Sequence, residues 1–463
     1  MNHRTLLLVA PPVLCAKSWW GNRIANKPHL ASLAGYVRDL ADVRILELDL
    51  SNEDDTDAQL SLLDEQLDEP VSLVGISCWT SMHFLGTLAV AERVRSLVPD
   101  TPIVVGGHHA TASPGDFTHA VCDWVVRGDG EHVLRKLCTE WPRRPHEMQV
   151  VSGDLFDQSN PDHVDWEHYG RPGVKERVLW IGTSRGCSFQ CRFCVEPQRS
   201  ATYSRYSVND TLNILERLVQ SHEPSIIAFS DPLFGASRRW TEAFLDGIQR
   251  RSLPLMFWAE TRADLMTPEL LEAFKRCGFM LDFGLDTASG AMIHRMQKSA
   301  DPKRYLVRSR ETLEYADAIG LLHGVYLVFN FPGETPETAR ESQCFIESLG
   351  KANAPTSGWL SAQTFFILPG THAFDRMAEN AALYGTEIRH PNWWRETGDH
   401  YALATDVLPS AAWNGREDEL HAFNSWNDRI NAGWTARFTP EVQEFCSAFY
   451  RGSTVPVGLS KPE

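Results

Sequence analysis

Short apolar runs alternate with amphipathic segments along most of this chain, and this alternation limits the possible folds more than any other feature. In the first 155 residues the runs lie at 4–10, 42–50, 72–79 and 101–109, and an amphipathic segment at 85–98 separates the last two. Strands that alternate with helices predict an α/β fold with a parallel, doubly wound sheet. Ligands of such sheets bind beyond the carboxyl ends of the strands.

The alternation resumes after a polar stretch, 156–176, which is expected to be a linker. Six further apolar runs end in polar loops, and they begin at Val178, Ser225, Leu255, Phe279, His323 and Trp359. Six β–α units predict a partial (β/α)6 barrel whose catalytic groups lie at the carboxyl ends of its strands. We therefore expect an N-terminal domain over 1–155, the linker, a barrel over 177–372 and a polar, aromatic capping region over 373–463 at the barrel mouth.

Composition and charge narrow the possible partners. The chain has 44 Lys and Arg against 60 Asp and Glu residues, a net charge of −16. This balance argues against binding to nucleic acid or to a membrane surface and favours a small cationic ligand, although it can equally serve solubility. No apolar run approaches the ~18 residues needed to span a bilayer, and ten cysteines are too few for a disulfide scaffold. We expect a cytoplasmic protein with reduced thiols.

Three cysteines, Cys187, Cys191 and Cys194, follow the first predicted barrel strand in the stretch RGCSFQCRFC. Thiolates at this spacing can bind three corners of a [4Fe–4S] cluster and leave one iron without a protein ligand. A zinc site that lacks its fourth ligand and a set of unrelated buried cysteines are the alternatives.

The motif, with the aromatic Phe193 before its last cysteine, resembles that of the radical S-adenosylmethionine (SAM) superfamily. The resemblance implies that the amino and carboxylate groups of SAM fill the open iron. It also implies that an external one-electron donor, such as flavodoxin, ferredoxin or a dedicated reductase, reduces the cluster. SAM is then cleaved to a 5′-deoxyadenosyl radical that abstracts a substrate hydrogen.

The resemblance continues through the barrel and suggests further SAM-binding residues. SDPLF replaces the usual glycine-glycine-glutamate loop at the SAM amine, WAETRAD supplies an arginine for the SAM carboxylate, GLDTASG matches the ribose loop, and FNFPGET matches the family's GxPGET. For each side chain, strand-end packing or helix capping remains the alternative. The implied residues are Ser230, Asp231, Arg262, Asp286, Ser289 and Asn330.

The N-terminal region resembles the cobalamin (B12)-binding domain of one radical SAM subgroup. The resemblance is carried by VGISCW at 74–79, the pair Gly106–Gly107 and DWVVRGDGE at 123–131. No D-x-H-x-x-G motif offers a histidine as lower axial ligand. Bulky Trp79 and the Trp19–Trp20 pair could occupy the volume that the cofactor needs, so the sequence leaves cobalamin binding open.

The reaction depends on that choice. Without cobalamin, the chain resembles the radical SAM diol dehydratases of aminoglycoside biosynthesis, and we expect dehydration of a paromamine-like cationic sugar. Glu260, Asp231 and Asp282 are candidate carboxylates for its ammonium groups, and the general acid is not identified. With cobalamin, the alternative is a C- or P-methyltransferase in natural-product biosynthesis. A non-catalytic electron carrier or B12 sensor is a third hypothesis.

Overall fold

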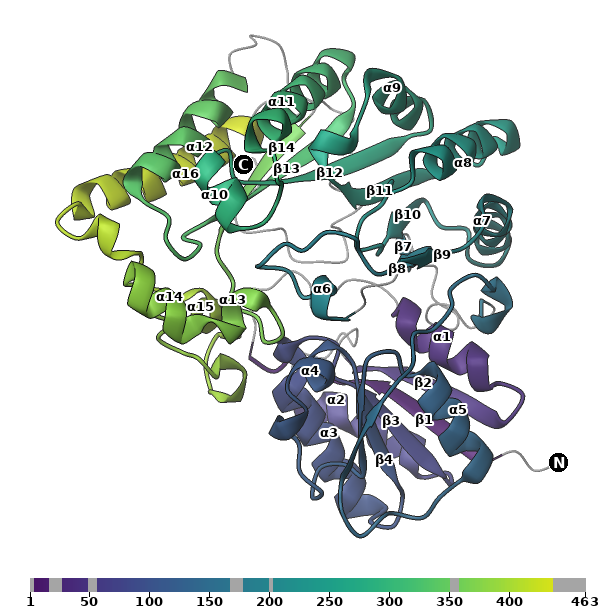
Figure 1. The fold of residues 1–463 in the computed structure, drawn as a ribbon. Coiled ribbons are helices and arrows are strands. Elements are labelled where there is room, and N and C mark those ends of the chain that lie inside the picture. Colours follow the sequence, from purple (N-terminus) through teal and green to yellow (C-terminus); the bar gives the residue numbers. More distant parts are fainter. Residues whose placement is uncertain are drawn as a thin grey trace.

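The structure is a computed structural model that describes residues 4–15, 27–48, 56–166, 178–199, 203–349 and 358–435. It has two lobes, each built on a six-stranded parallel sheet (Figure 1). The N-terminal lobe is purple to blue in Figure 1, and the barrel lobe is teal to green. The predicted α/β class, with a doubly wound domain followed by a partial barrel, is confirmed.

The first sheet has the strand order β2-β1-β3-β4-β5-β6, and all of its pairings are parallel. Its strands are β1 (Arg4–Ala10), β2 (Ala41–Glu47), β3 (Leu73–Ser77), β4 (Ile103–Gly106), β5 (Trp124–Arg127) and β6 (Gln149–Ser152). Its helices are α1 (Pro28–Val37), α2 (Thr56–Leu67), α3 (Phe84–Leu97), α4 (His108–Ala112) and α5 (Glu131–Glu140).

Side-chain alternation in β1 explains why helices cover both faces of this sheet. Leu7 and Val9 pack in the same apolar cluster as residues of α2 and α3. Leu6 and Leu8 belong to a second cluster with residues of α1 and α5. Because successive side chains of a strand point to opposite faces, a continuous apolar run produces a strand that is buried on both sides.

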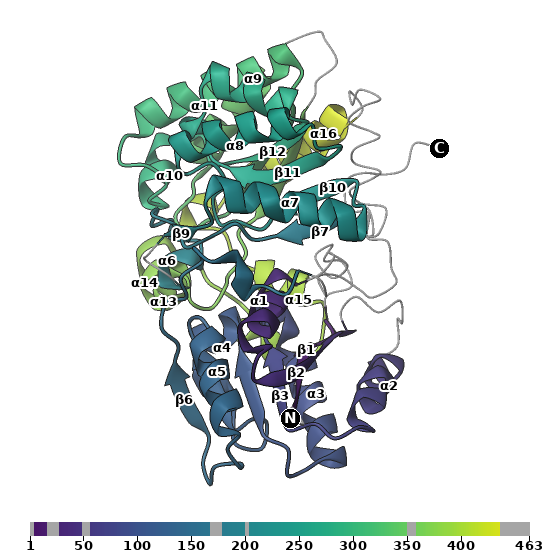
Figure 2. The same ribbon diagram turned by 90° about the vertical axis from the view of Figure 1, so that its right-hand side faces the viewer.

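The second sheet has the order β14-β13-β12-β11-β10-β7, so each strand lies beside its sequence neighbour in this sheet, as in a partial barrel. Its strands are β7 (Val178–Ile181), β10 (Ile226–Phe229), β11 (Met256–Thr261), β12 (Phe279–Asp286), β13 (Leu322–Phe329) and β14 (Gly358–Thr364). Its helices are α7 (Val208–His222), α8 (Arg238–Arg251), α9 (Pro268–Arg276), α10 (Gly290–Arg295), α11 (Pro302–Ile319) and α12 (Pro336–Leu349). Helices α7, α8, α9 and α11 form its outer layer (Figure 2).

The two faces of β11 show how the barrel lobe is packed. Phe257 and Ala259 belong to the large core cluster that includes residues of α7, α8, α9 and α11. Trp258 points to the other face, where it packs in a small cluster with Met280, and Trp180 lies against that cluster. Glu260 follows Trp258 by two residues and therefore lies on the same, inner face.

A short antiparallel pair, β8 (Ser184–Arg185) and β9 (Ser204–Arg205), and the helix α6 (Glu196–Arg199) flank the cysteine motif. The region after β14 forms α13 (His372–Asp375), α14 (Met377–Tyr384), α15 (His400–Thr405) and α16 (Glu417–Thr435). No described helix is long and apolar enough to cross a membrane.

The region that we expected to cap the barrel mouth packs in two directions. Trp394 Nε1 donates a hydrogen bond to Asp116 Oδ2 at 2.6 Å, and Arg395 Nη2 donates to Asp116 Oδ1 at 2.7 Å, which joins this region to the N-terminal lobe. In α16, Phe423 and Trp426 belong to the barrel core. The C-terminal region thus contacts both lobes.

Candidate active site

The three cysteines of the motif lie on one loop between β8 and α6. The Cys194 amide donates a hydrogen bond to the Cys191 carbonyl oxygen at 3.1 Å. All three residues are half-buried. Burial raises the pKa of the Cys194 thiol to about 12, and the neighbouring thiols of Cys191 and Cys187 add to this effect. The structure therefore brings the three predicted ligands together.

This donor set fits an iron–sulfur cluster. In the part of the chain that the structure describes, no group of three or more His, Cys, Asp and Glu side chains is arranged to hold a single metal ion. A cubane cluster requires a different arrangement of ligands from a single ion, because each thiolate binds a different iron. The loop is held on both sides, since the Arg192 amide donates to the Met296 carbonyl oxygen at 3.0 Å and the Ala373 amide donates to the Arg192 carbonyl oxygen at 3.0 Å.

Arg262 lies beside this loop at the end of β11. Its guanidinium stacks on the ring of Phe189, which lies within the cysteine motif, at 3.9 Å from the ring centroid. Nε and Nη2 donate to the two carboxylate oxygens of Asp264 at 3.0 and 3.1 Å, and Nη2 also donates to the Lys298 carbonyl oxygen at 2.9 Å. Nη1 is buried without a hydrogen-bond partner. A buried donor without a partner is available to a carboxylate such as that of SAM.

Asp286 and Ser289, which the sequence assigns to the ribose loop, lie at the carboxyl end of β12. Asp286 is the last residue of the strand, and Ser289 follows it by three residues. Asp286 has a φ of 59°, in the left-handed region that few non-glycine residues adopt. Its carboxylate pairs with the buried Lys298 ammonium. Ser289 Oγ is buried without a hydrogen-bond partner. The charges of Lys298, Asp286 and Arg262 all act on the Cys191 thiol, so these residues surround the cysteine loop.

Ser230 and Asp231 have different environments although they are adjacent. The Asp231 carboxylate accepts hydrogen bonds from the Thr183 amide and Thr183 Oγ1, both at 2.6 Å, and from Ser184 Oγ at 2.8 Å. Asp231 thus fixes the connection between β7 and the cysteine loop. The Ser230 side chain is exposed to a cavity between the lobes.

Phe193 and Asn330 make contacts within the protein. Phe193 packs against the apolar cluster that joins the N-terminal lobe to the C-terminal region. Asn330 has a φ of 60°, its amide donates to Glu334 Oε2 at 2.6 Å, and its Nδ2 donates to the Val407 carbonyl oxygen at 2.7 Å. Their roles in cofactor binding stay predictions.

Gly106 and Gly107 lie at the carboxyl end of β4. Gly107 has a φ of 109°, and a Cβ there would lie 2.4 Å from the Cys78 carbonyl oxygen, so the backbone at this position requires glycine. A Cβ on Gly106 would instead meet only Val126 Cβ, at 3.9 Å. Gly106 therefore borders open space.

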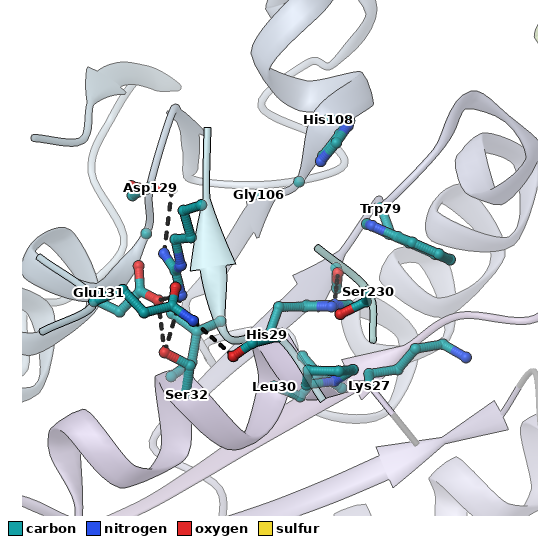
Figure 3. A pocket seen from close by; sticks show the side chains of 18 of the residues that line it. Lys27, His29, Leu30, Ser32, Trp79, Gly106, His108, Asp129, Glu131 and Ser230 are labelled. Carbon is teal, nitrogen blue, oxygen red and sulfur yellow. Dashed lines mark hydrogen bonds and ion pairs between the residues drawn. The ribbon is translucent and has the colours of Figure 1, made fainter. Parts of the chain in front are cut away.

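That space is a cavity of about 550 Å³ between the two lobes. Residues of the N-terminal lobe form one wall, where Figure 3 shows His29, Trp79, Gly106 and His108. The barrel lobe contributes Trp180, Cys194, Ser230, Trp258 and Glu260. The cavity thus connects the glycine edge of the first sheet with the cysteine loop.

Trp79 lines this cavity without filling it. Its ring stacks on His29 with the ring centroids 6.0 Å apart, and His29 Nε2 forms a hydrogen bond with Ser77 Oγ at 2.8 Å. The Trp79 ring lies against His29, and a cavity remains beside Gly106. Trp19 and Trp20 lie outside the described residues.

Sequence reasoning missed an ion-pair network that joins the two lobes. Arg185 Nη2 lies 2.5 Å from Glu131 Oε1, and Arg185 Nη1 lies 3.3 Å from Asp129 Oδ1. Ser32 Oγ donates to the same Glu131 oxygen at 2.8 Å, and Figure 3 shows Ser32, Asp129 and Glu131 on one side of the cavity. Since Arg185 precedes Cys187 by two residues, the network fixes the cysteine loop relative to the N-terminal lobe.

Two known protein families match the two regions of the chain that form this site. Residues 26–138, which include Gly106, match the model of the B12 binding domain. Residues 181–343, which include the three cysteines, match the model of the radical SAM superfamily. The chain is a radical SAM enzyme with a B12-binding domain.

Individual relatives of this radical SAM enzyme agree with that assignment. The uncharacterized methyltransferase PH0819 of Pyrococcus horikoshii is 25% identical over 375 residues, 75% of this chain and 79% of that protein. The anaerobic magnesium-protoporphyrin IX monomethyl ester cyclase of Rubrivivax gelatinosus is 23% identical over 348 residues, 68% of this chain and 60% of that protein.

A solved structure shares the whole fold. It is the structure of the radical SAM methyltransferase TsrM from Kitasatospora setae, with cobalamin and a [4Fe-4S] cluster bound. The match has a TM-score of 0.69 and spans 95% of this chain and 90% of the TsrM chain. At 17% sequence identity, this similarity shows that the radical SAM enzyme has the same two-lobed architecture.

Arg262 gives a direct test of the SAM site. Arg262→Ala is expected to weaken SAM binding more than tenfold, because truncating one partner of a water-shielded guanidinium–carboxylate pair costs about 2–5 kcal/mol. Equilibrium dialysis with SAM would measure the loss. Visible absorbance must show an intact cluster, since Arg262 also stacks on Phe189. Arg238→Ala, on the surface of α8, is the control, and unchanged SAM affinity in Arg262→Ala would place the SAM carboxylate elsewhere.

Proposed function

We propose that this radical SAM enzyme is a cobalamin-dependent methyltransferase that acts on a small molecule. The observation that carries the proposal is the single cavity that borders both Gly106 and Cys194. A cofactor held at the glycine edge and a cluster held by the cysteines would face the same cavity. A substrate in that space could reach both.

The residues around Gly106 suit the nucleotide tail of a cobalamin. The cavity wall there is largely apolar and lies between the sheet and helices α1 and α5, with Leu8, Leu30, Leu33, Val104, Val126 and Leu134 as its apolar side chains. Because Gly106 presents no side chain, a planar group can approach the sheet edge closely. The chain has no D-x-H-x-x-G motif, so a bound cobalamin would take no histidine ligand from such a motif.

The side chains of the chain itself bind and orient the reactants. When bound, the cluster and SAM supply one-electron chemistry and cobalamin supplies a methyl carrier. Cys187, Cys191 and Cys194 would hold the cluster, and Arg262 Nη1, which has no partner in the protein, would donate to the SAM carboxylate. The Asp231 hydrogen bonds keep the cysteine loop fixed. The cavity lies between the two lobes, so residues of both would contact the reactants.

The comparisons favour methyl transfer over the dehydration that we expected first. PH0819 is named as a methyltransferase, and TsrM is described as one with cobalamin bound. Neither a diol dehydratase nor an aminoglycoside substrate has support from these relatives. In the sequence, only the net charge and three bulky tryptophans favour dehydration, and of these tryptophans Trp79 lines the cavity without filling it.

Corrinoid retention separates the two reactions. The protein is reconstituted anaerobically with iron and sulfide, mixed with hydroxocobalamin and passed through a gel-filtration column. We expect about one corrinoid per chain to co-elute, as a resident cofactor should. Protein that carries a cluster but no corrinoid would contradict the proposal and restore the cobalamin-free reaction.

A further inference from the structure

The inner face of the barrel presents an acidic and aromatic surface to the cavity. Trp180 of β7 and Trp258 of β11 line the cavity, with their ring centroids 5.0 Å apart and their planes at 60°. Glu260 lines it as well, two residues after Trp258. Asp282 is the register partner of Glu260 on the neighbouring strand β12.

Asp282 fixes one of these rings. It is fully buried, and its Oδ2 accepts hydrogen bonds from Trp258 Nε1 at 2.9 Å and from the Tyr326 hydroxyl at 2.7 Å. Its Oδ1 has no hydrogen-bond partner. Burial raises the pKa of Asp282 to about 7, and the negative charge of Glu260 contributes. Asp282 is therefore a positioning residue that sets the orientation of Trp258.

Glu260 differs because its carboxylate is left unpaired. In the described part of the chain no side chain forms a hydrogen bond or ion pair with it. Its side chain is exposed and lines the cavity between the lobes. Desolvation by the surrounding cavity walls, together with the charge of Asp286, raises its pKa to about 7. A carboxylate that lines a cavity without a partner in the protein is available to pair with a cationic ligand.

In the described part of the chain, none of the basic side chains that line the cavity forms an ion pair or hydrogen bond with this carboxylate. Arg185 is held by Glu131 and Asp129 on the N-terminal side. Lys27, His29 and His108 lie on the wall formed by the first sheet and its helices (Figure 3). The barrel side of the cavity therefore combines a carboxylate with two indole rings, and Arg185, a basic residue that this lobe contributes to the lining, is already paired with Glu131 and Asp129.

We propose that Glu260 binds a protonated amine of the substrate, with the partly exposed Trp180 ring beside the same group. Carboxylates pair with ammonium groups, and indole faces attract cations, best where water is excluded. This inference rests on the proposed function only in placing the substrate in the shared cavity. Of the three carboxylates considered from sequence, it selects Glu260, because Asp231 and Asp282 are engaged in hydrogen bonds within the protein.

The test compares three probes of similar shape: phenethylamine, 2-phenylethanol and 3-phenylpropionate. Binding to the reconstituted holoenzyme is measured by isothermal titration and by saturation-transfer NMR. We expect the amine to bind at least tenfold more tightly than the alcohol, and the carboxylate to bind least. Glu260→Gln should bind amine and alcohol within about twofold of each other, whereas Glu260→Asp should keep part of the preference.

Glu242→Gln, on the exposed surface of α8, is the matched control and should behave as wild type. Equal affinity for amine and alcohol in the wild type, no amine binding at millimolar concentration, or a preference that survives in Glu260→Gln would each overturn the inference. Corrinoid and iron contents are measured on the same samples. A protein that prefers amines but retains no corrinoid would contradict the methyltransferase proposal and leave this inference standing.

Discussion

Alanine at Cys187, Cys191 or Cys194 is expected to abolish assembly of the iron–sulfur cluster. Each thiolate is one of only three protein ligands, so its loss leaves two irons open instead of one. The loop around the thiols is held by Met296 and Ala373 and should keep its fold. The loss would be measured after anaerobic reconstitution as lower iron and sulfide content and lower visible absorbance. SAM cleavage should be lost in the same samples.

Cys344→Ala is the control for this series, because Cys344 is exposed on α12. It should retain about four irons per chain. A single variant at 187, 191 or 194 that also retains about four irons would remove that residue from the ligand set.

Gly106→Leu is expected to lower corrinoid retention at least tenfold. A side chain at this position would project beside Val126 into the space proposed for the cobalamin tail, and its Cβ meets no other atom within 4 Å. The substitution should therefore leave the fold intact and fill the cavity. Cobalt and iron are measured on the same gel-filtered sample, and the iron content should match that of the wild type.

Gly115→Leu is the matched control, since Gly115 lies in the same lobe and a Cβ there meets nothing within 4 Å. It should retain corrinoid as the wild type does. Full retention in Gly106→Leu would mean that cobalamin, if it binds, does not use this edge of the sheet.

The strands of the fold were predictable because parallel strands buried on both faces form continuous apolar runs. All six barrel runs became strands, and the run at 4–10 became β1 with the expected bounds. Strand ends were less predictable. The run at 101–109 yields only Ile103–Gly106, because Gly107 turns into the left-handed region and α4 begins at His108.

The site was predictable where it is local in sequence. The cysteine motif places three predicted ligands within eight residues, so the sequence suggests them without knowledge of the fold. Lys298 has no such signal, because its pairing with Asp286 depends on how α10 follows β12. The Arg185–Glu131 pair joins residues that are 54 positions apart in different lobes. The size of Trp79 could not predict the direction of its side chain, which lies against His29.

Cobalamin-dependent formation of S-adenosylhomocysteine tests the central claim most directly and needs no knowledge of the substrate. The reconstituted enzyme is incubated anaerobically with SAM and a strong reductant, with and without cobalamin, and the SAM-derived products are quantified by mass spectrometry. The account predicts S-adenosylhomocysteine only when cobalamin is present, and little of it from Gly106→Leu. Formation of 5′-deoxyadenosine and methionine alone, at the same rate with or without cobalamin, would contradict it.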